Sequence, residues 1–225
     1  IFLYTGLGAV TRGTSQVPFS IIRPGYPVGA FWAANVTGII QTQEQLVNYQ
    51  KLNSNAKLGD YMFEDINKDG KINENDADRT FAGSPLPKVT VSLNNNFSYK
   101  NWSLSLFFNG QFGNKIFNAE RMLFARQVGR FAEENTLREA ATSPIKDDKT
   151  GAFNYFVEDG SFVRLNNARL AYTFPKIGVL SRAQIYVSGQ NLFVITKFKG
   201  VDPEMNTGFA TAGVYTKQQF PKSRG

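Results

Sequence analysis

The chain has no cysteine and no histidine, and each absence removes a class of chemistry. Without cysteine, it can form no disulfide and offers no thiolate ligand to a metal. Without histidine, it lacks the most frequent general base and the most frequent ligand of transition metals. Zinc sites and hydrolase mechanisms that depend on histidine are therefore excluded within these 225 residues.

Long apolar runs are absent as well. No stretch of about 20 apolar residues occurs, so the sequence predicts no transmembrane helix. Ile1 opens the chain with neither a basic stretch nor a cleavage site, so no signal peptide is expected at this end. The net charge is +7, but Lys and Arg are scattered singly, and no nucleic-acid partner is expected.

Aromatic residues, by contrast, are abundant. The chain holds 20 Phe, 9 Tyr and 2 Trp, which is 14% of its residues. The mean hydropathy is nevertheless only −0.29. Many aromatic residues at a low mean hydropathy are typical of alternating strands that turn one face to lipid and the other to water.

Residues 89–112 show the clearest strand pattern. Apolar and polar residues alternate up to Tyr99 and again from Trp102, and Lys100 and Asn101 between them predict a hairpin with a two-residue turn. The polar face carries Ser, Thr and Asn, whereas a solvated face usually carries Lys, Glu and Arg. This polar face suits the interior of a membrane barrel, and the aromatic pair Tyr99 and Trp102 suits the membrane interface.

A second strand pair is predicted within residues 162–195. Alternation resumes at Asn167, a short connection covers residues 175–182, and the return strand covers residues 183–195. This pair repeats the pattern of the first: strands of about ten residues joined by a short turn.

Three long segments separate or follow these strands: residues 12–88, 113–160 and 196 onward. Short helices are predicted within them over residues 42–52 and 133–141. Short turns at one end of the strands and long loops at the other are typical of outer-membrane barrels. So few strands cannot close a barrel. The predicted fold class is therefore all-β: strands and long external loops of a larger transmembrane β-barrel.

Residues 65–76 follow the spacing of a calcium loop. Oxygen-bearing side chains stand at its first, third, fifth and twelfth places, and a glycine at the sixth allows the sharp turn. The predicted ligands are Asp65, Asn67, Asp69, the carbonyl of Lys71, Asn73 and Asp76. This all-oxygen set favours a structural Ca²⁺ over Mg²⁺, which rarely takes so many protein ligands. The alternative is an Asx-rich turn in which the same side chains accept hydrogen bonds from nearby backbone amides.

Aromatic residues in the predicted loops are candidates for stacking against sugar rings: Phe31, Trp32, Tyr155 and Phe156. Their alternative role is packing within the loops or contact with a partner. The acidic neighbours Glu133 and Glu134, and likewise Glu158 and Asp159, do not suit glycoside hydrolysis, because adjacent residues seldom face each other across a scissile bond. No catalytic residue, and hence no enzyme, is predicted.

Several motifs occur in the order in which one family carries them. They lie at residues 25–31 (GYPVGAF), 38–41 (GIIQ), 59–60 followed by the Asp65 loop, 83–88 (GSPLPK), 158–167 (EDGSFVRLNN), 189–193 (GQNLF) and 197–204 (KFKGVDPE). Together they resemble the carboxy-terminal part of the SusC/RagA family of TonB-dependent outer-membrane transporters, and the resemblance covers almost the whole chain.

The resemblance implies a bacterial outer-membrane barrel of about 22 strands around an amino-terminal plug. It also implies a SusD-like surface lipoprotein as partner, energy supplied by TonB through the plug, and import of oligosaccharides or peptides. In that reading residues 1–225 are a carboxy-terminal barrel fragment that also contacts membrane lipid. The external loop with the calcium-like motif covers about 12–88, and strands cover about 89–112 and 162–195.

Alternatives from other classes make different demands on the sequence. A soluble, calcium-stabilised β-sandwich that binds carbohydrate should carry charged residues on its outer strand face, and this chain does not. A calcium-dependent module of dockerin type needs a second copy of the loop, which the sequence lacks. A secreted hydrolase lacks a suitable pair of carboxylates.

Overall fold

The structure is a computed structural model that describes residues 3–6, 18–74, 77–125, 136–146, 151–176, 178, 182–204 and 213–215. The chain forms two compact units. The first comprises Ile1–Leu86, Lys115–Glu158 and Met205–Gln219, and the second comprises Pro87–Asn114, Asp159–Glu204 and Phe220–Gly225. Strands dominate both, with few and short helices, so the predicted all-β fold class is confirmed.

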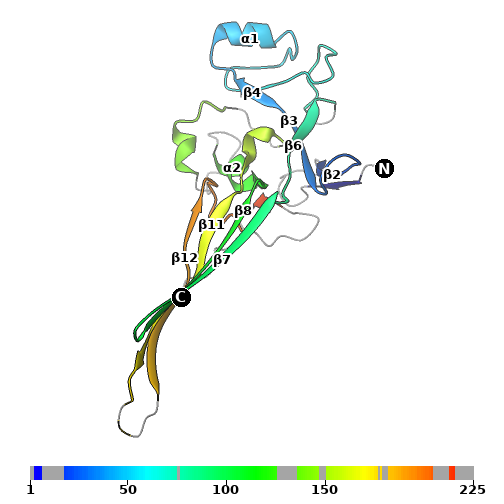
Figure 1. Cartoon of the computed structure of the whole chain (residues 1–225). Helices are drawn as coiled ribbons and strands as arrows, with labels where there is room; N and C mark the ends of the chain where they lie inside the picture. The colour runs from blue at the N-terminus through cyan, green and yellow to red at the C-terminus, as the bar shows by residue number, and fades with distance from the viewer. Residues whose placement is uncertain are drawn as a thin grey trace. The chain divides into compact units, whose positions relative to one another are not determined.

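The second unit contains a four-stranded antiparallel sheet in the order β12-β11-β8-β7 (Figure 1). Its strands are β7 (Val89–Tyr99), β8 (Trp102–Phe112), β11 (Phe162–Phe174) and β12 (Ala183–Thr196). The two predicted strand pairs are thus confirmed and join through β8 and β11. Lys100 takes a positive φ of 52° in the predicted tight turn, a conformation that a two-residue hairpin connection requires.

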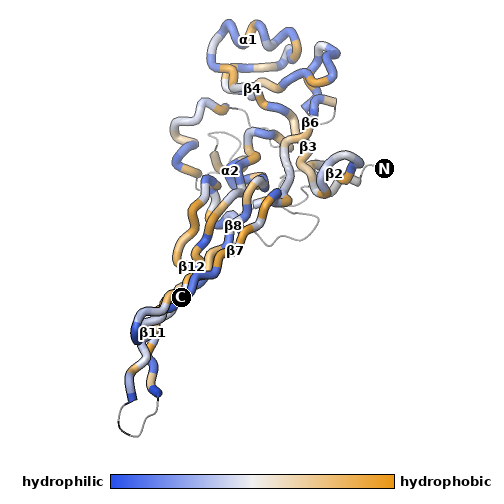
Figure 2. The backbone as a smooth tube through the Cα atoms, viewed as in Figure 1, coloured by the Kyte–Doolittle hydropathy of each residue, from blue (hydrophilic) through white to orange (hydrophobic). Residues whose placement is uncertain are grey.

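The register of the four strands gives the sheet one largely apolar face. Side chains directly opposite one another point to the same side. Three rows on that side are Leu93, Phe108, Leu165 and Phe193; Phe97, Leu104, Leu170 and Val187; and Tyr99, Trp102, Tyr172 and Ile185. Between the first two lies a row of Asn95, Leu106, Ala168 and Gly189. Figure 2 shows apolar and polar residues following one another along these strands. The predicted alternation therefore holds over most of the sheet, although Phe107 and Tyr186 lie on the opposite face.

The opposite face is polar. One of its rows is Asn96, Ser105, Arg169 and Ser188. The register shifts between Leu165 and Asn167: against β8, Asn166 is an extra residue of β11, and against β12, Asn166 faces the two residues Asn191 and Leu192. Asn191 lies at the matching place in β12 with a positive φ of 51°. Because the bulge adds one residue, Leu165 and Ala168 point to the same face although they are three residues apart.

The first unit is built from short strands. One sheet has the order β1-β2-β3-β6, with β1 (Leu3–Gly6), β2 (Pro18–Ile22), β3 (Ala30–Ala34) and β6 (Arg79–Gly83). A separate ladder pairs β4 (Val36–Ile39) with β5 (Tyr61–Phe63). A third sheet has the order β10-β9-β13, with β9 (Lys115–Asn118), β10 (Val157–Asp159) and β13 (Val214–Tyr215).

Helix α1 (Gln43–Tyr49) lies where a helix over residues 42–52 was predicted. Thr42 caps it: its hydroxyl accepts a hydrogen bond from the Gln45 amide, and the Gln45 side chain accepts one from the Thr42 amide. This reciprocal capping box satisfies two amides that a helix start otherwise leaves unpaired. Tyr49 is buried at the other end of the helix, against Ile40 and Ala56.

The remaining helices of the first unit are short. They are α2 (Ala119–Phe124) and the 3₁₀ turns η1 (Arg138–Ala141) and η2 (Asn154–Phe156). Of the helix predicted at 133–141, residues 138–141 form η1, residues 136 and 137 are not helical, and residues 133–135 lie outside the described ranges. No helix within those ranges has the length and apolar character needed to cross a membrane.

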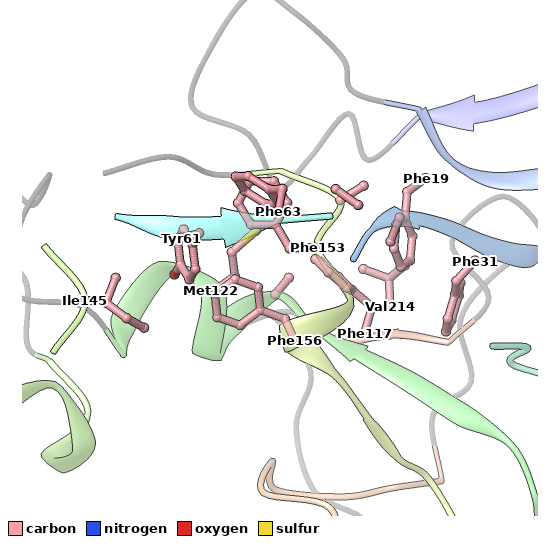
Figure 3. Packing of buried hydrophobic residues seen from close by; sticks show 14 residues of the cluster. Phe19, Phe31, Tyr61, Phe63, Phe117, Met122, Ile145, Phe153, Phe156 and Val214 are labelled. Atoms are coloured by element: carbon pink, nitrogen blue, oxygen red, sulfur yellow. The ribbon is translucent and has the colours of Figure 1, made fainter. Parts of the chain in front are cut away.

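The core of the first unit is rich in aromatic rings. Fourteen buried residues form one cluster, from β2, β3, β5, β9, α2, η2 and β13 among other segments (Figure 3). Phe19 stacks on Phe31 with ring centroids 4.6 Å apart, and Phe153 lies 4.8 Å from Phe63. This packing joins segments far apart in sequence, so the long regions predicted as irregular are in fact folded around a core of their own.

Candidate functional site

The calcium-like loop lies in the first unit, between β5 and β6. The structure describes all of its predicted ligands except Asp76, which falls outside the described residues. Asp65, Asn67, Asp69 and Lys71 are in the described part, as is Asn73. The left-handed backbone at Lys68 (φ 60°) and at Gly70 (φ 79°) bends the loop sharply.

Oxygen atoms of three predicted ligands gather around this bend. The Asp69 amide donates to Asp65 Oδ1 at 3.2 Å and to Asn67 Oδ1 at 3.1 Å. The Gly70 amide donates to Asp65 Oδ2 at 2.9 Å. These bonds bring Asp65 and Asn67 to the same backbone amide.

The oxygen atoms of these side chains are ligands that suit a hard cation. Asp69 Oδ1 accepts from the Lys71 amide, and Asp69 Oδ2 accepts from Asn67 Nδ2, both at 2.9 Å. Carboxylate and amide oxygens each keep a further lone pair for an ion. Within the described ranges, no three His, Cys, Asp or Glu side chains gather closely enough to hold a metal. The described loop has the geometry of an Asx-rich turn, and cation binding stays a prediction.

Asp78 is an acid beside the loop that was not among the predicted ligands. Its side chain is fully buried, and it accepts hydrogen bonds from the amides of Ile66 and Asn73 at 2.9 and 2.6 Å. It stands two places beyond Asp76, outside the spacing of a calcium loop. A buried carboxylate needs such donors, because an unsolvated charge is costly. Nothing in the sequence distinguishes this acid from Asp76.

Two of the four aromatic candidates lie in the core. Phe31 in β3 and Phe156 in η2 are 0% and 1% exposed, and each packs against other rings. Neither ring has a face open to a ligand, so packing is their role in this structure. Phe31 was predicted to lie in a loop. It lies in strand β3, where it packs in the aromatic core against Phe19.

Trp32 lies on the other side of β3 and belongs to an exposed aromatic patch. Its ring is 5.6 Å from Tyr26 in an edge-on arrangement, and Tyr26 is 5.6 Å from Phe81. The Arg23 guanidinium lies 5.6 Å from the rings of both Tyr26 and Trp32. Tyr26 and Phe81 are exposed. We name these four residues the β3 aromatic patch.

Tyr155 is half-buried and borders a polar network around Arg121. The Arg121 guanidinium lies 5.1 Å from the Tyr155 ring and donates to Glu139 Oε1 at 2.7 Å. Glu158 Oε1 is 3.6 Å away from it. Burial by itself would lower the pKa of Arg121, but the hydrogen bond and charge of Glu139 outweigh it, so the pKa is raised. This network fixes the neighbourhood of Tyr155 and keeps Arg121 charged.

Known proteins similar to this chain are receptors of one kind. TonB-dependent receptor P3 of Formosa agariphila is 31% identical over 199 residues, 83% of this chain and 19% of that protein. TonB-dependent receptor P26 of the same organism is 31% identical over 226 residues, 89% and 22% of the two chains. TonB-dependent receptor SusC of Bacteroides thetaiotaomicron is 28% identical over 174 residues, which are 72% of this chain and 17% of that protein. The chain spans roughly one fifth of these relatives.

Solved structures of similar fold agree with these relatives. The chain matches part of the RagAB peptide transporter with a TM-score of 0.67 and 22% identity, over 91% of this chain and 22% of that one. It matches the RagAB peptide importer in the open-open state with a TM-score of 0.65 and 23% identity, over 95% of this chain and 23% of that one. No family model matches the chain. On the identity to P3 and P26, the chain belongs to the TonB-dependent receptor family, and it is similar to SusC in sequence and to RagAB in fold.

Proposed function

We propose that this chain supplies strands and external loops to an outer-membrane transporter that imports nutrients with energy delivered through TonB. The names of the relatives support this activity, since they are TonB-dependent receptors, and RagAB is a peptide importer. The chain would form the carboxy-terminal part of a barrel of about 22 strands, whose plug and TonB-contacting segment belong to the rest of the polypeptide.

The two-faced sheet of the second unit is the observation that carries this proposal. Its strands have 11 to 14 residues, enough to cross a bilayer when tilted. Apolar rows cover one face, and the rows of Ser, Asn and Arg on the other face suit a water-filled or plugged interior. Tyr99, Trp102 and Tyr172 share one row at the end of the sheet, where a membrane interface favours aromatic rings.

The partner would be a SusD-like surface lipoprotein, and the cargo an oligosaccharide or a peptide. The fold shared with the RagAB peptide importer supports a peptide as cargo. The similarity to SusC supports the alternative, an oligosaccharide, through the family resemblance given above. In this proposal the loops of the first unit lie outside the cell. There the β3 aromatic patch and Tyr155 would contact cargo or the lipoprotein, because exposed rings can stack on sugars or side chains.

The test uses the full-length protein in its own outer membrane. Cells would be given labelled oligosaccharides and labelled peptides, with and without a functional TonB, and uptake would be measured. We expect TonB-dependent uptake of one of the two classes and co-purification of a surface lipoprotein. A full-length protein recovered from the soluble fraction, without effect on uptake, would contradict the proposal and favour the soluble carbohydrate-binding module.

We also propose that the loop at Asp65 binds a structural Ca²⁺. Its support is the oxygen set of Asp65, Asn67 and Asp69 around one bend, together with Gly70 at the place where calcium loops turn. Asp65→Asn should weaken binding of Tb³⁺, a luminescent substitute for Ca²⁺, to the full-length protein. Equal Tb³⁺ signals from wild type and Asp65→Asn would contradict a site at this loop.

A further inference from the structure

Asp78 occupies an unusual place beside the calcium-like loop. Its carboxylate is 0% exposed, and backbone amides of the loop surround it. Oδ1 accepts from the Ile66 amide at 2.9 Å and, more weakly, from the Asn67 amide at 3.5 Å. Oδ2 accepts from the Asn73 amide at 2.6 Å. One carboxylate therefore holds two stretches of backbone at once.

These stretches lie near the beginning of the loop and after its bend. Ile66 and Asn67 stand at its second and third places, and Asn73 at its ninth. The Asp78 amide donates back to the Asn73 carbonyl at 3.1 Å, so Asn73 is held through both of its backbone groups. Such amides converging on one anion form a fixed, positively polarised cradle. The loop is closed through Asp78.

Neighbouring contacts secure the same end of the loop. Arg79 Nε donates to the Glu74 carbonyl at 3.1 Å. The Ile72 amide donates to the Leu52 carbonyl at 3.3 Å, and the Ile72 side chain packs on the buried cluster around Ile40. The segment that follows the bend is thereby fixed to the folded unit, which leaves the bend itself at the surface.

We propose that Asp78 is the carboxylate that closes this loop and sets its shape before any cation arrives. The spacing of a calcium loop assigns the closing role to its twelfth residue, Asp76. Asp78 performs closure with hydrogen bonds to backbone amides, which no metal needs to mediate. The consequence for affinity rests on the proposed Ca²⁺ site: a loop that is already shaped loses less conformational freedom when it binds.

The experiment is limited proteolysis of the full-length protein in outer-membrane preparations. Lys68 and Lys71 are exposed on the loop, so trypsin reports how often the loop opens. Asp78→Asn should speed cleavage at these lysines about tenfold, with or without Ca²⁺, because an amide cannot accept at both of its ends. Asp76→Asn, the matched control, should leave the cleavage rate in chelator unchanged.

The outcomes separate the closing role from the calcium proposal. Wild-type cleavage rates in Asp78→Asn, or faster cleavage in Asp76→Asn alone, would overturn the closing role. If chelator does not change cleavage of the wild type while Asp78→Asn is cleaved faster, the closing role stands and the calcium proposal fails. Asp65→Asn adds a check on the calcium proposal alone, since it should abolish any Ca²⁺ effect on cleavage.

A measurement on the wild type alone covers the case in which Asp78→Asn fails to assemble. Hydrogen exchange followed by mass spectrometry would report on the amides of Ile66 and Asn73. We expect both to exchange slowly in chelator, at least about tenfold more slowly than the exposed amide of Lys68. Fast exchange at both amides in chelator, followed by protection in Ca²⁺, would overturn the proposal, because a cation would then be shaping the loop.

Discussion

Arg164 Nη2 lies 2.5 Å from Asp202 Oδ1, and both side chains are buried. The two residues are 38 positions apart, one in β11 and the other in the segment that follows β12. Glu204 Oε2 lies 3.1 Å from Arg164 Nε, and the Glu204 amide donates to Asp202 Oδ1 at 2.9 Å. This ion pair fastens the segment after β12 to the polar face of the sheet.

Removing one partner should therefore be costly. Arg164→Ala leaves Asp202 buried without its cation, and we expect it to lower the free energy of unfolding by about 3–5 kcal/mol. Arg169→Ala, two rows along the same face but exposed, should cost less than about 1 kcal/mol. Thermal unfolding of the full-length protein in detergent would compare them. Arg164→Met combined with Asp202→Leu should recover much of the loss, and equal midpoints for the two single variants would contradict the ion pair's role.

Neighbouring positions in β3 offer a second comparison. Phe31→Ala opens a cavity in the aromatic core and should cost about 3–5 kcal/mol of unfolding free energy. Trp32→Ala removes a ring from the β3 aromatic patch and should cost about 1 kcal/mol. Under the proposed function, Trp32→Ala should instead weaken cargo or lipoprotein binding, measured by uptake and co-purification. A large loss of stability in Trp32→Ala would place that ring in the core.

Two glycines with positive φ should differ sharply when replaced by alanine. At Gly25 (φ 87°) a Cβ would meet nothing within 4 Å, so Gly25→Ala should cost only the backbone strain, about 1–2 kcal/mol. At Gly213 (φ 72°) a Cβ would lie 2.5 Å from Pro85 Cβ and 2.8 Å from Phe31 Cζ. Gly213→Ala should cost at least about 3 kcal/mol. Chemical denaturation would measure both, and similar values would contradict the close approach.

Tyr49 should make stability fall at alkaline pH. Burial is the largest cause that raises the pKa of its hydroxyl to about 12, from 10.0. The folded state therefore keeps this proton where the unfolded state has lost it. The protonated Tyr49 hydroxyl contributes fully to the free energy of unfolding below pH 10. This contribution, about 2–3 kcal/mol in total, is lost as the pH rises towards 12. Tyr49→Phe should reduce that dependence, and tyrosinate absorbance during an alkaline titration would report the pKa directly.

The long strands were predictable because alternation continues over many residues. Eleven residues of β7 and eleven of β8 leave no ambiguity about period or turn. The capped helix at Thr42 was predictable for the same kind of reason, since its capping residues are local. The bulge at Asn166 was not, because it depends on the partner strands that set the register.

The core of the first unit escaped sequence analysis for a physical reason. Its strands have two to five residues, too few to show a period, and their pairing joins Ala34 to Arg79 and Val214 to Phe117. Burial of Phe31 and Phe156 follows from such distant pairing. The candidate loop shows the same division: its ligand spacing is local and visible in the sequence, whereas the burial of Asp78 depends on the fold around it.

The sheet of the second unit ends in β7 on one edge and β12 on the other. Each of these strands, 11 and 14 residues long, offers a row of backbone donors and acceptors along its outer edge within this sheet. Such edges readily pair with other chains. Production of the 225-residue chain by itself should therefore favour self-association into edge-paired aggregates, whereas in the proposed barrel neighbouring strands would cover both edges.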